Sequence, residues 1–384
     1  MAQARRSGAS PAPSLTQRSH SRRYKGRVAL PTLRRLAVLV AGALLAVAVV
    51  ALAARGAESA APVSLRALTL DDDAVAHIDS SRLARAAVSY RGGPITTSTG
   101  EVVNVRVSDA LPSEITPESW AEFFVHLTHG PELAQLTAYI GTLDEVQDIC
   151  GERALGCYGR DQLVAPGEAV LDTSAEEILR HEYGHHIAEH RLNDPWSAID
   201  WGPKRWSSAA NVCPRVGRKE AYPGDEGTNY SLNPGEAWAE VYRLMDEHKA
   251  GITTASWEII DPSFFPDADD LAAAEQDVVQ PWTAPRSRLY TRTFGKRTPH
   301  VWWISLATPL DGNLRVSATV PSRGDGSVEV VLVGPNRQTA LRRAQWVSQR
   351  VKTMDASVCG QRSMFVRVIQ RGFVGRVRVS VTTP

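Results

Sequence analysis

His181, Glu182 and His185 form the sequence HEYGH, and their types and spacing favour metal chemistry more clearly than any other group in the chain. On an α-helix, four residues advance about 400° and about 6 Å, so the two imidazoles would project from one face. Two imidazoles placed in this way can bind one zinc ion. Glu182 would be displaced by about 100° from His181, where its carboxylate can take a proton from water instead of binding the metal. The pattern predicts a metal site with a general base beside it.

The sequence around this motif predicts the helix that it requires. In LDTSAEEILRHEYGHHIAEHR, Ser174 followed by Glu177 is typical of a helix start at which each side chain accepts a hydrogen bond from the backbone N–H of the other. The Asn-Asp-Pro sequence at 193–195 is expected to end the helix. His186 and His190 flank the motif and are interpreted as exposed histidines or as neighbours of the metal ligands.

A catalytic zinc ion takes three protein ligands and keeps one position open, so a third ligand is needed. A histidine six residues after the second is excluded, because that position is Arg191. Residues 228–251, TNYSLNPGEAWAEVYRLMDEHKAG, predict a second helix that begins after Asn233. Glu236 and Glu240 lie one turn apart on one face of this helix, either as metal-site carboxylates or as a solvated acidic stripe.

At these residues the sequence resembles the anthrax lethal factor-like group of glutamate-zincin metallopeptidases, over about residues 156–250. Those enzymes carry HExxH, then a tyrosine, and then a helix of the type NExxFAExF whose first glutamate binds zinc. The resemblance implies that Glu236 is the third zinc ligand and that Glu240 orients a zinc-binding histidine. It also implies that Tyr230 stabilises the oxyanion with a hydrogen bond, and that the fold is an α+β zincin-like catalytic domain.

The expected function is that of an extracytoplasmic zinc-dependent endopeptidase, a hydrolase whose substrate is a peptide or protein. Zinc would activate water, and Glu182 would move the proton of that water to the leaving amine. Residues 156–166, GCYGRDQLVAP, predict an edge strand above the zinc helix that can pair with an extended peptide. The alternative is a non-catalytic cell-surface binding protein with a structural zinc site. Glu182 argues against that alternative, because a structural site needs no general base.

The N-terminal residues predict an exported protein. Residues 1–35 carry only basic charges and are expected to form a disordered cytoplasmic tail. They lead into LAVLVAGALLAVAVVALAA, residues 36–54, an apolar run just long enough to cross a hydrocarbon core of about 30 Å. This run is interpreted as a transmembrane signal anchor with the rest of the chain outside the cell membrane, or as a cleaved signal peptide of a secreted protein. Residues 57–75 are then a linker.

The four cysteines, Cys150, Cys157, Cys213 and Cys359, fit an oxidising compartment. Four cysteines allow three disulfide connectivities. Cys150 and Cys157 bracket a short loop and are favoured as one pair, which leaves Cys213 for Cys359. Zinc binding by the cysteines lacks support, because no CxxC spacing occurs.

The chain is long enough for two globular domains, with 384 residues, 43% hydrophobic and 22% charged. Residues 76–285 mix helix and strand patterns and form the predicted metallopeptidase domain. After residue 285, segments such as LRVSATV and SVEVVLV alternate apolar and polar residues between turns, which predicts an all-β sandwich domain over 286–384. This second domain resembles the pre-peptidase C-terminal domains of secreted proteases. The net charge of +1 indicates no nucleic-acid partner.

Overall fold

The computed structural model describes residues 89–253, 256–257, 259–320, 327–372 and 375–384. The chain divides into two units, of which only the second, beginning at Ala61, contains described residues. The predicted basic tail, the membrane-spanning segment at 36–54 and the linker at 57–75 all lie outside the described residues. Within the described ranges, no helix is both long enough and apolar enough to cross a membrane.

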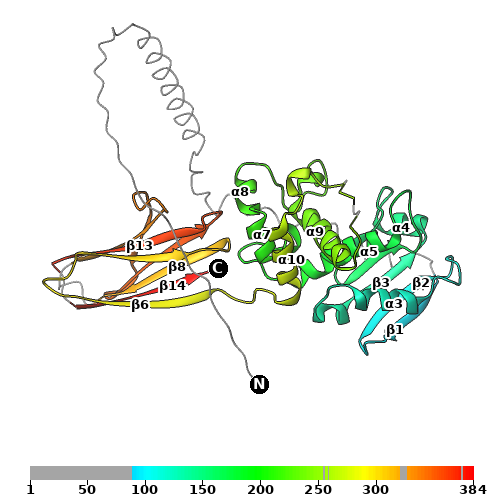
Figure 1. Cartoon of the computed structure of the whole chain (residues 1–384), viewed down its shortest axis with the longest axis horizontal. Helices are drawn as coiled ribbons and strands as arrows, with labels where there is room; N and C mark the ends of the chain where they lie inside the picture. The colour runs from blue at the N-terminus through cyan, green and yellow to red at the C-terminus, as the bar shows by residue number, and fades with distance from the viewer. Residues whose placement is uncertain (1–88, 254–255, 258, 321–326, 373–374) are drawn as a thin grey trace, which may run out of the picture. The chain divides into compact units, whose positions relative to one another are not determined.

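The first described part contains a mixed five-stranded sheet with the order β1-β2-β3-β5-β4 (Figure 1). Its strands are β1 (Tyr90–Thr96), β2 (Val102–Ser108), β3 (Thr137–Gly141), β4 (Cys157–Gly159) and β5 (Gln162–Pro166). β2, β3 and β5 run parallel to one another, while β1 and β4 pair antiparallel at the two edges. The predicted extended segment at 156–166 is therefore a hairpin, and β4 is the edge strand of the sheet.

Helices follow and interrupt these strands, as expected for an α+β fold. They are α3 (Pro117–His126), η2 (Pro131–Gln135), α4 (Leu143–Cys150), α5 (Ala175–Glu189), α6 (Ala198–Trp201), α7 (Lys204–Ala209), α8 (Val212–Gly217), η3 (Tyr230–Leu232), α9 (Pro234–Lys249), η4 (Pro262–Phe264) and α10 (Ala268–Val279). The predicted capping box of Ser174 and Glu177 starts α5, and Asn233 caps α9 as expected. α5 ends at Glu189, before the Asn-Asp-Pro sequence.

The core of this part joins the sheet to α5 and α9. Leu179 and Tyr183 on α5 are fully buried, as are Trp238 and Tyr242 on α9, and all four belong to one apolar cluster with residues from β2, β3 and β5. The mutual burial of these large side chains holds the two helices side by side. The helix with HEYGH and the helix with Glu236 are therefore in direct contact.

The second described part consists of two antiparallel sheets, with orders β10-β9-β13-β7 and β11-β12-β8-β14-β6 (Figure 1). Its strands are β6 (Arg286–Phe294), β7 (Val301–Ala307), β8 (Gly312–Thr319), β9 (Ser327–Val333), β10 (Ala340–Arg343), β11 (Gln345–Trp346), β12 (Val351–Val358), β13 (Ser363–Arg371) and β14 (Gly375–Thr383). Residues of both sheets, such as Val316 and Val330, share one apolar core. This arrangement is the expected β-sandwich.

Two disulfides are formed in the described residues, Cys150–Cys157 and Cys213–Cys359. The first joins the end of α4 to β4, the edge strand. The second joins α8 to the residue that follows β12 in the sandwich. Both match the favoured connectivity, and they indicate an extracytoplasmic or secreted protein.

Candidate metal centre

The centre is built where α5 and α9 cross, and Gly184 permits their close approach. A Cβ added to Gly184 would lie 2.8 Å from the Cα of Ala239 on α9, which is far inside a normal contact. Trp238 donates a hydrogen bond of 2.8 Å from its indole N–H to the carbonyl oxygen of Gly184. The glycine of HEYGH therefore lets the second helix lie against the motif and fixes the position of its acidic residues.

Three buried side chains converge at this crossing. The Nε2 atom of His181 lies 3.2 Å from Oε2 of Glu236, and Nε2 of His185 lies 3.3 Å from Oε1 of the same carboxylate. Ligands of one tetrahedral zinc ion, each at about 2.0–2.1 Å, are separated from one another by about 3.3 Å. The donor atoms of all three residues lie within 4.8 Å of one another. The group can hold a metal ion.

Glu240 lies behind His181 and orients its ring. The Oε2 atom of Glu240 is 3.1 Å from Nδ1 of His181, so a proton on Nδ1 leaves the lone pair of Nε2 directed at the centre. Arg243 donates to both oxygens of Glu240, at 2.5 and 3.0 Å. Burial alone would raise the pKa of Glu240, but the hydrogen bonds from His181 and Arg243 outweigh it and lower the pKa to about 2.

The carboxylates of the centre, Glu236 and Glu240, favour a positive charge on the histidines that they contact. Burial would lower the pKa of His181, yet its hydrogen bonds with Glu236 and Glu240 raise that pKa well above its usual value. Burial would raise the pKa of Glu236, yet the charge of His185 and the histidine hydrogen bonds lower it far below its usual value. A divalent cation binds the same lone pairs that these protons occupy. The donor set therefore fits a bound metal ion.

Glu182 faces the same centre from α5 but stays outside the ligand set. A Cβ built on Gly156 would lie 2.7 Å from Oε1 of Glu182, so the backbone that leads into β4 passes directly over this carboxylate. Burial raises the pKa of Glu182, and the charges of His181 and His185 offset this only in part. A carboxylate whose pKa is raised from its ordinary value is suited to accept and release a proton.

Tyr230 reaches the centre from η3, the short helix that precedes α9. Its hydroxyl donates a hydrogen bond of 2.6 Å to Oε2 of Glu236. Burial and the charge of Glu236 both raise the pKa of the Tyr230 phenol far above its usual value. The group is therefore a protonated hydrogen-bond donor at the edge of the centre.

A cleft of about 910 Å³ opens over these residues. Its lining includes His181, Glu182, His185, Tyr230 and Glu236, together with Gly156, Cys157 and Tyr158 of the edge-strand region. A peptide that entered this cleft would therefore meet the edge-strand region and the candidate metal centre together.

No family model matches this chain. No curated protein matches it at a significant level. Among solved structures, the pre-peptidase C-terminal domain of a collagenase from Bacillus anthracis has weak similarity, with 14% sequence identity and a TM-score of 0.20. The match covers 25% of this chain and 88% of that domain. A similarity of this size carries no argument about fold or function.

The structure brings together every predicted metal-site residue on α5, η3 and α9. Two further residues at the centre, Arg243 and Glu226, were not predicted from the spacing. Arg243 holds Glu240, and its position three residues after that glutamate was a usable signal. Glu226 lies in the loop before η3 and accepts a hydrogen bond from Asn233. Burial, with Glu236 nearby, raises the pKa of Glu226 to about 7. Its position in the loop offered no such signal.

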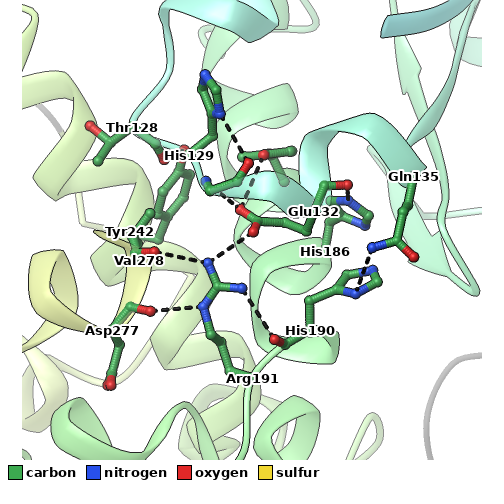
Figure 2. A network of polar contacts seen from close by, with 12 residues as sticks. Thr128, His129, Glu132, Gln135, His186, His190, Arg191, Tyr242, Asp277 and Val278 are labelled. Atoms are coloured by element: carbon green, nitrogen blue, oxygen red, sulfur yellow. Dashed lines mark hydrogen bonds and ion pairs between the residues drawn. The ribbon is translucent and has the colours of Figure 1, made fainter. Parts of the chain in front are cut away.

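Arg191 occupies the position at which a third histidine ligand would stand. It anchors the C-terminal end of α5 (Figure 2). It makes a buried ion pair of 3.0 Å with Glu132 of η2, and it donates to the backbone carbonyl of Asp277 in α10. Burial alone would raise the pKa of Glu132, but the Arg191 charge helps to lower it, so the pair is ionised. Arg191 therefore ties the chain just after α5 to both η2 and α10.

Proposed function

We propose that this chain is an extracytoplasmic zinc-dependent endopeptidase whose zinc ligands are His181, His185 and Glu236. The observation that carries the proposal is the convergence of three buried donor atoms at metal-ligand spacing, with Glu182 beside them in a cleft. Two imidazoles and one carboxylate, with access for water and substrate, form the donor set of a hydrolytic zinc site. A buried carboxylate at the wall of the cleft serves hydrolysis and has no role in a purely structural site.

The residues around the centre divide the chemistry among them. When bound, zinc supplies Lewis-acid polarisation of the scissile carbonyl and lowers the pKa of water. Glu182 accepts a proton from the attacking water and delivers it to the leaving amine nitrogen. Tyr230 turns its hydroxyl proton from Glu236 to the oxyanion, where the hydrogen bond is strongest in the transition state. Glu240 keeps His181 in the orientation and tautomer that binding requires.

A peptide is the substrate class that the cleft suits best. β4 pairs with β5 on one side only and stands at the edge of the sheet, so its other side can pair with an extended backbone. The Cys150–Cys157 disulfide fastens this strand to α4. We propose that the active chain lies outside the cytoplasm, as its disulfides indicate. Residues 36–54 would be its membrane anchor or export signal.

Metal removal tests the proposal on the full chain. We expect the zinc-loaded protein to hydrolyse casein or a mixed peptide library, a chelator to abolish hydrolysis, and added zinc to restore it. The measurements are zinc content by elemental analysis and peptide release by mass spectrometry. Hydrolysis that continues after the metal has been removed would contradict the proposal, as would the failure of zinc-loaded protein to cleave any peptide in the library.

A further inference from the structure

α5 carries a second pair of histidines with the same spacing as the first. His186 and His190 follow His181 and His185 by five residues each, which is a rotation of about 140° around the helix axis. The second pair therefore faces away from the cleft centre. In the structure it meets Asp161, from the turn that joins β4 to β5. His186 is completely buried, so of the two interpretations of this residue, exposed or a neighbour of the metal ligands, the first is wrong.

We propose that Asp161, His186 and His190 form a second binding site for a divalent transition-metal ion. Oδ1 of Asp161 lies 2.7 Å from Nε2 of His190 and 3.6 Å from Nδ1 of His186. The three donor atoms lie within 4.8 Å of one another, as they do in the first centre. These separations bracket the spacing of about 3.3 Å between ligands of one tetrahedral zinc ion. Metal binding at this site does not depend on the proposed peptidase activity.

The hydrogen bonds around His186 leave the lone pair of Nδ1 directed at this site. Its Nε2 atom lies 2.9 Å from the backbone carbonyl oxygen of Glu132, which can only accept, so Nε2 carries the proton (Figure 2). A metal-binding histidine is characteristically held in this way, with its other ring nitrogen donating to a carbonyl or carboxylate. The tautomer that metal binding needs is therefore the one that Glu132 selects.

His190 has a comparable partner. The side-chain amide nitrogen of Gln135 lies 3.5 Å from its Nδ1 atom (Figure 2). Turning this amide by 180° would place its oxygen there instead, where it can accept from a protonated Nδ1. The lone pair of Nε2, which lies 2.7 Å from Oδ1 of Asp161, can then bind a cation together with that carboxylate. The polar neighbours of both rings thus allow both inward-facing nitrogens to act as ligands.

The site contains more acceptors than protons. The Tyr158 hydroxyl lies 2.9 Å from Nδ1 of His186 and also donates a short hydrogen bond to Glu189. One hydroxyl proton cannot satisfy both acceptors, so either the imidazole nitrogen or the carboxylate is left facing an oxygen lone pair. The backbone N–H of Asp161 also donates to this hydroxyl, at 3.1 Å. A cation between His186, His190 and Asp161 would satisfy the nitrogen that lacks a proton.

Two imidazole nitrogens and one carboxylate oxygen select zinc and its transition-metal neighbours over calcium or magnesium, which prefer oxygen ligands. The Asp161 side chain is 41% exposed and that of His190 is 21% exposed, so water can complete the coordination. Asp161 belongs to the turn of the β4–β5 hairpin, where its φ of 63° is left-handed. A metal here would fasten that turn to the end of α5 and hold the edge strand beside the cleft.

The test is the zinc stoichiometry of the full chain and its variants, measured by elemental analysis after dialysis against zinc-containing and then zinc-free buffer. We expect two zinc ions per wild-type chain, one in Asp161→Asn, one in His185→Gln, and none in the combined variant. Asparagine keeps the size of the side chain and tolerates the left-handed turn. Asp148→Asn, the same change at an exposed position on α4, is the matched control and should retain both ions.

Thermal unfolding gives a second measurement. Added zinc should raise the melting temperature of the His185→Gln protein, and this rise should be lost when Asp161→Asn is added to it. If Asp161→Asn fails to fold, His190→Gln replaces it in both measurements. Unchanged stoichiometry in a folded Asp161→Asn or His190→Gln variant would overturn the second site. Unchanged stoichiometry in His185→Gln alone would instead overturn the first centre, so the two failures are distinguishable.

Discussion

At the scale of single residues, the spacing of His181 and His185 predicted a pair that the structure places in one centre, because four residues along a helix fix the relative direction of two side chains. The links between helices were beyond such reasoning. The chain of contacts from Arg243 to Glu240 to His181 depends on how α9 is placed against α5. Helical period says nothing of that placement, and only the resemblance to a known family implied it.

Replacing each of the two glutamates on α9 with glutamine separates their roles. We predict that Glu236→Gln weakens zinc retention strongly, because it replaces a charged ligand that faces both histidines. Glu240 contacts His181 on the side away from the centre, so Glu240→Gln should weaken zinc affinity by about 10–100-fold. Competition with a chromophoric chelator measures both affinities. A Glu240→Gln variant that loses its zinc while Glu236→Gln keeps it would show that the ligand assignment is wrong.

At the scale of elements, the starts of helices could be predicted from the sequence, because capping contacts join residues that are close in the chain. Ser174, Glu177 and Asn233 each satisfy backbone N–H groups within three residues of themselves. Four strands of the sandwich, β6, β10, β11 and β12, escaped prediction, and the two longest of them show the opposite situation. β6 buries only Phe294 fully, and β12 buries only Met354 and Val358, so neither shows a continuous apolar alternation. Their pairing with β14 and β8 is set by neighbours distant in sequence.

The close contact of α5 with α9 yields a prediction at this scale. Gly184→Ala should gain about 1 kcal/mol of helix propensity, but its Cβ would meet the backbone of Ala239 at 2.8 Å. Overpacking of this kind costs about 1–3 kcal/mol, so we expect a lower melting temperature and weaker zinc retention as the helices move apart. Gly295→Ala is the control, because the nearest atom to its added Cβ is 3.9 Å away. A stable Gly184→Ala protein with normal zinc affinity would contradict this view of the crossing.

At the scale of the whole molecule, the change from mixed helix and strand patterns to alternating strands predicted two kinds of structure, and the described residues contain both. Their apolar cores are separate clusters, one of residues between Val103 and Val278 and the other between Phe294 and Val381. The Cys213–Cys359 disulfide and the hydrogen bond from the backbone N–H of Asp311 to Ser208 join them. Cysteine count alone left that connection open, because four cysteines permit three pairings.

The central claim, that this chain hydrolyses peptides with Glu182 as the general base, is tested most directly by the turnover of a zinc-loaded Glu182→Gln protein. Glu182 faces the centre without being one of the three grouped donors, so the variant should keep its zinc and its melting temperature. We predict that its turnover of a peptide falls by about a hundred- to ten-thousand-fold, the usual contribution of a general base. Glu176→Gln, the same change at an exposed position on α5, should leave turnover unchanged. Near-normal turnover in Glu182→Gln, with its zinc content confirmed, would contradict the account.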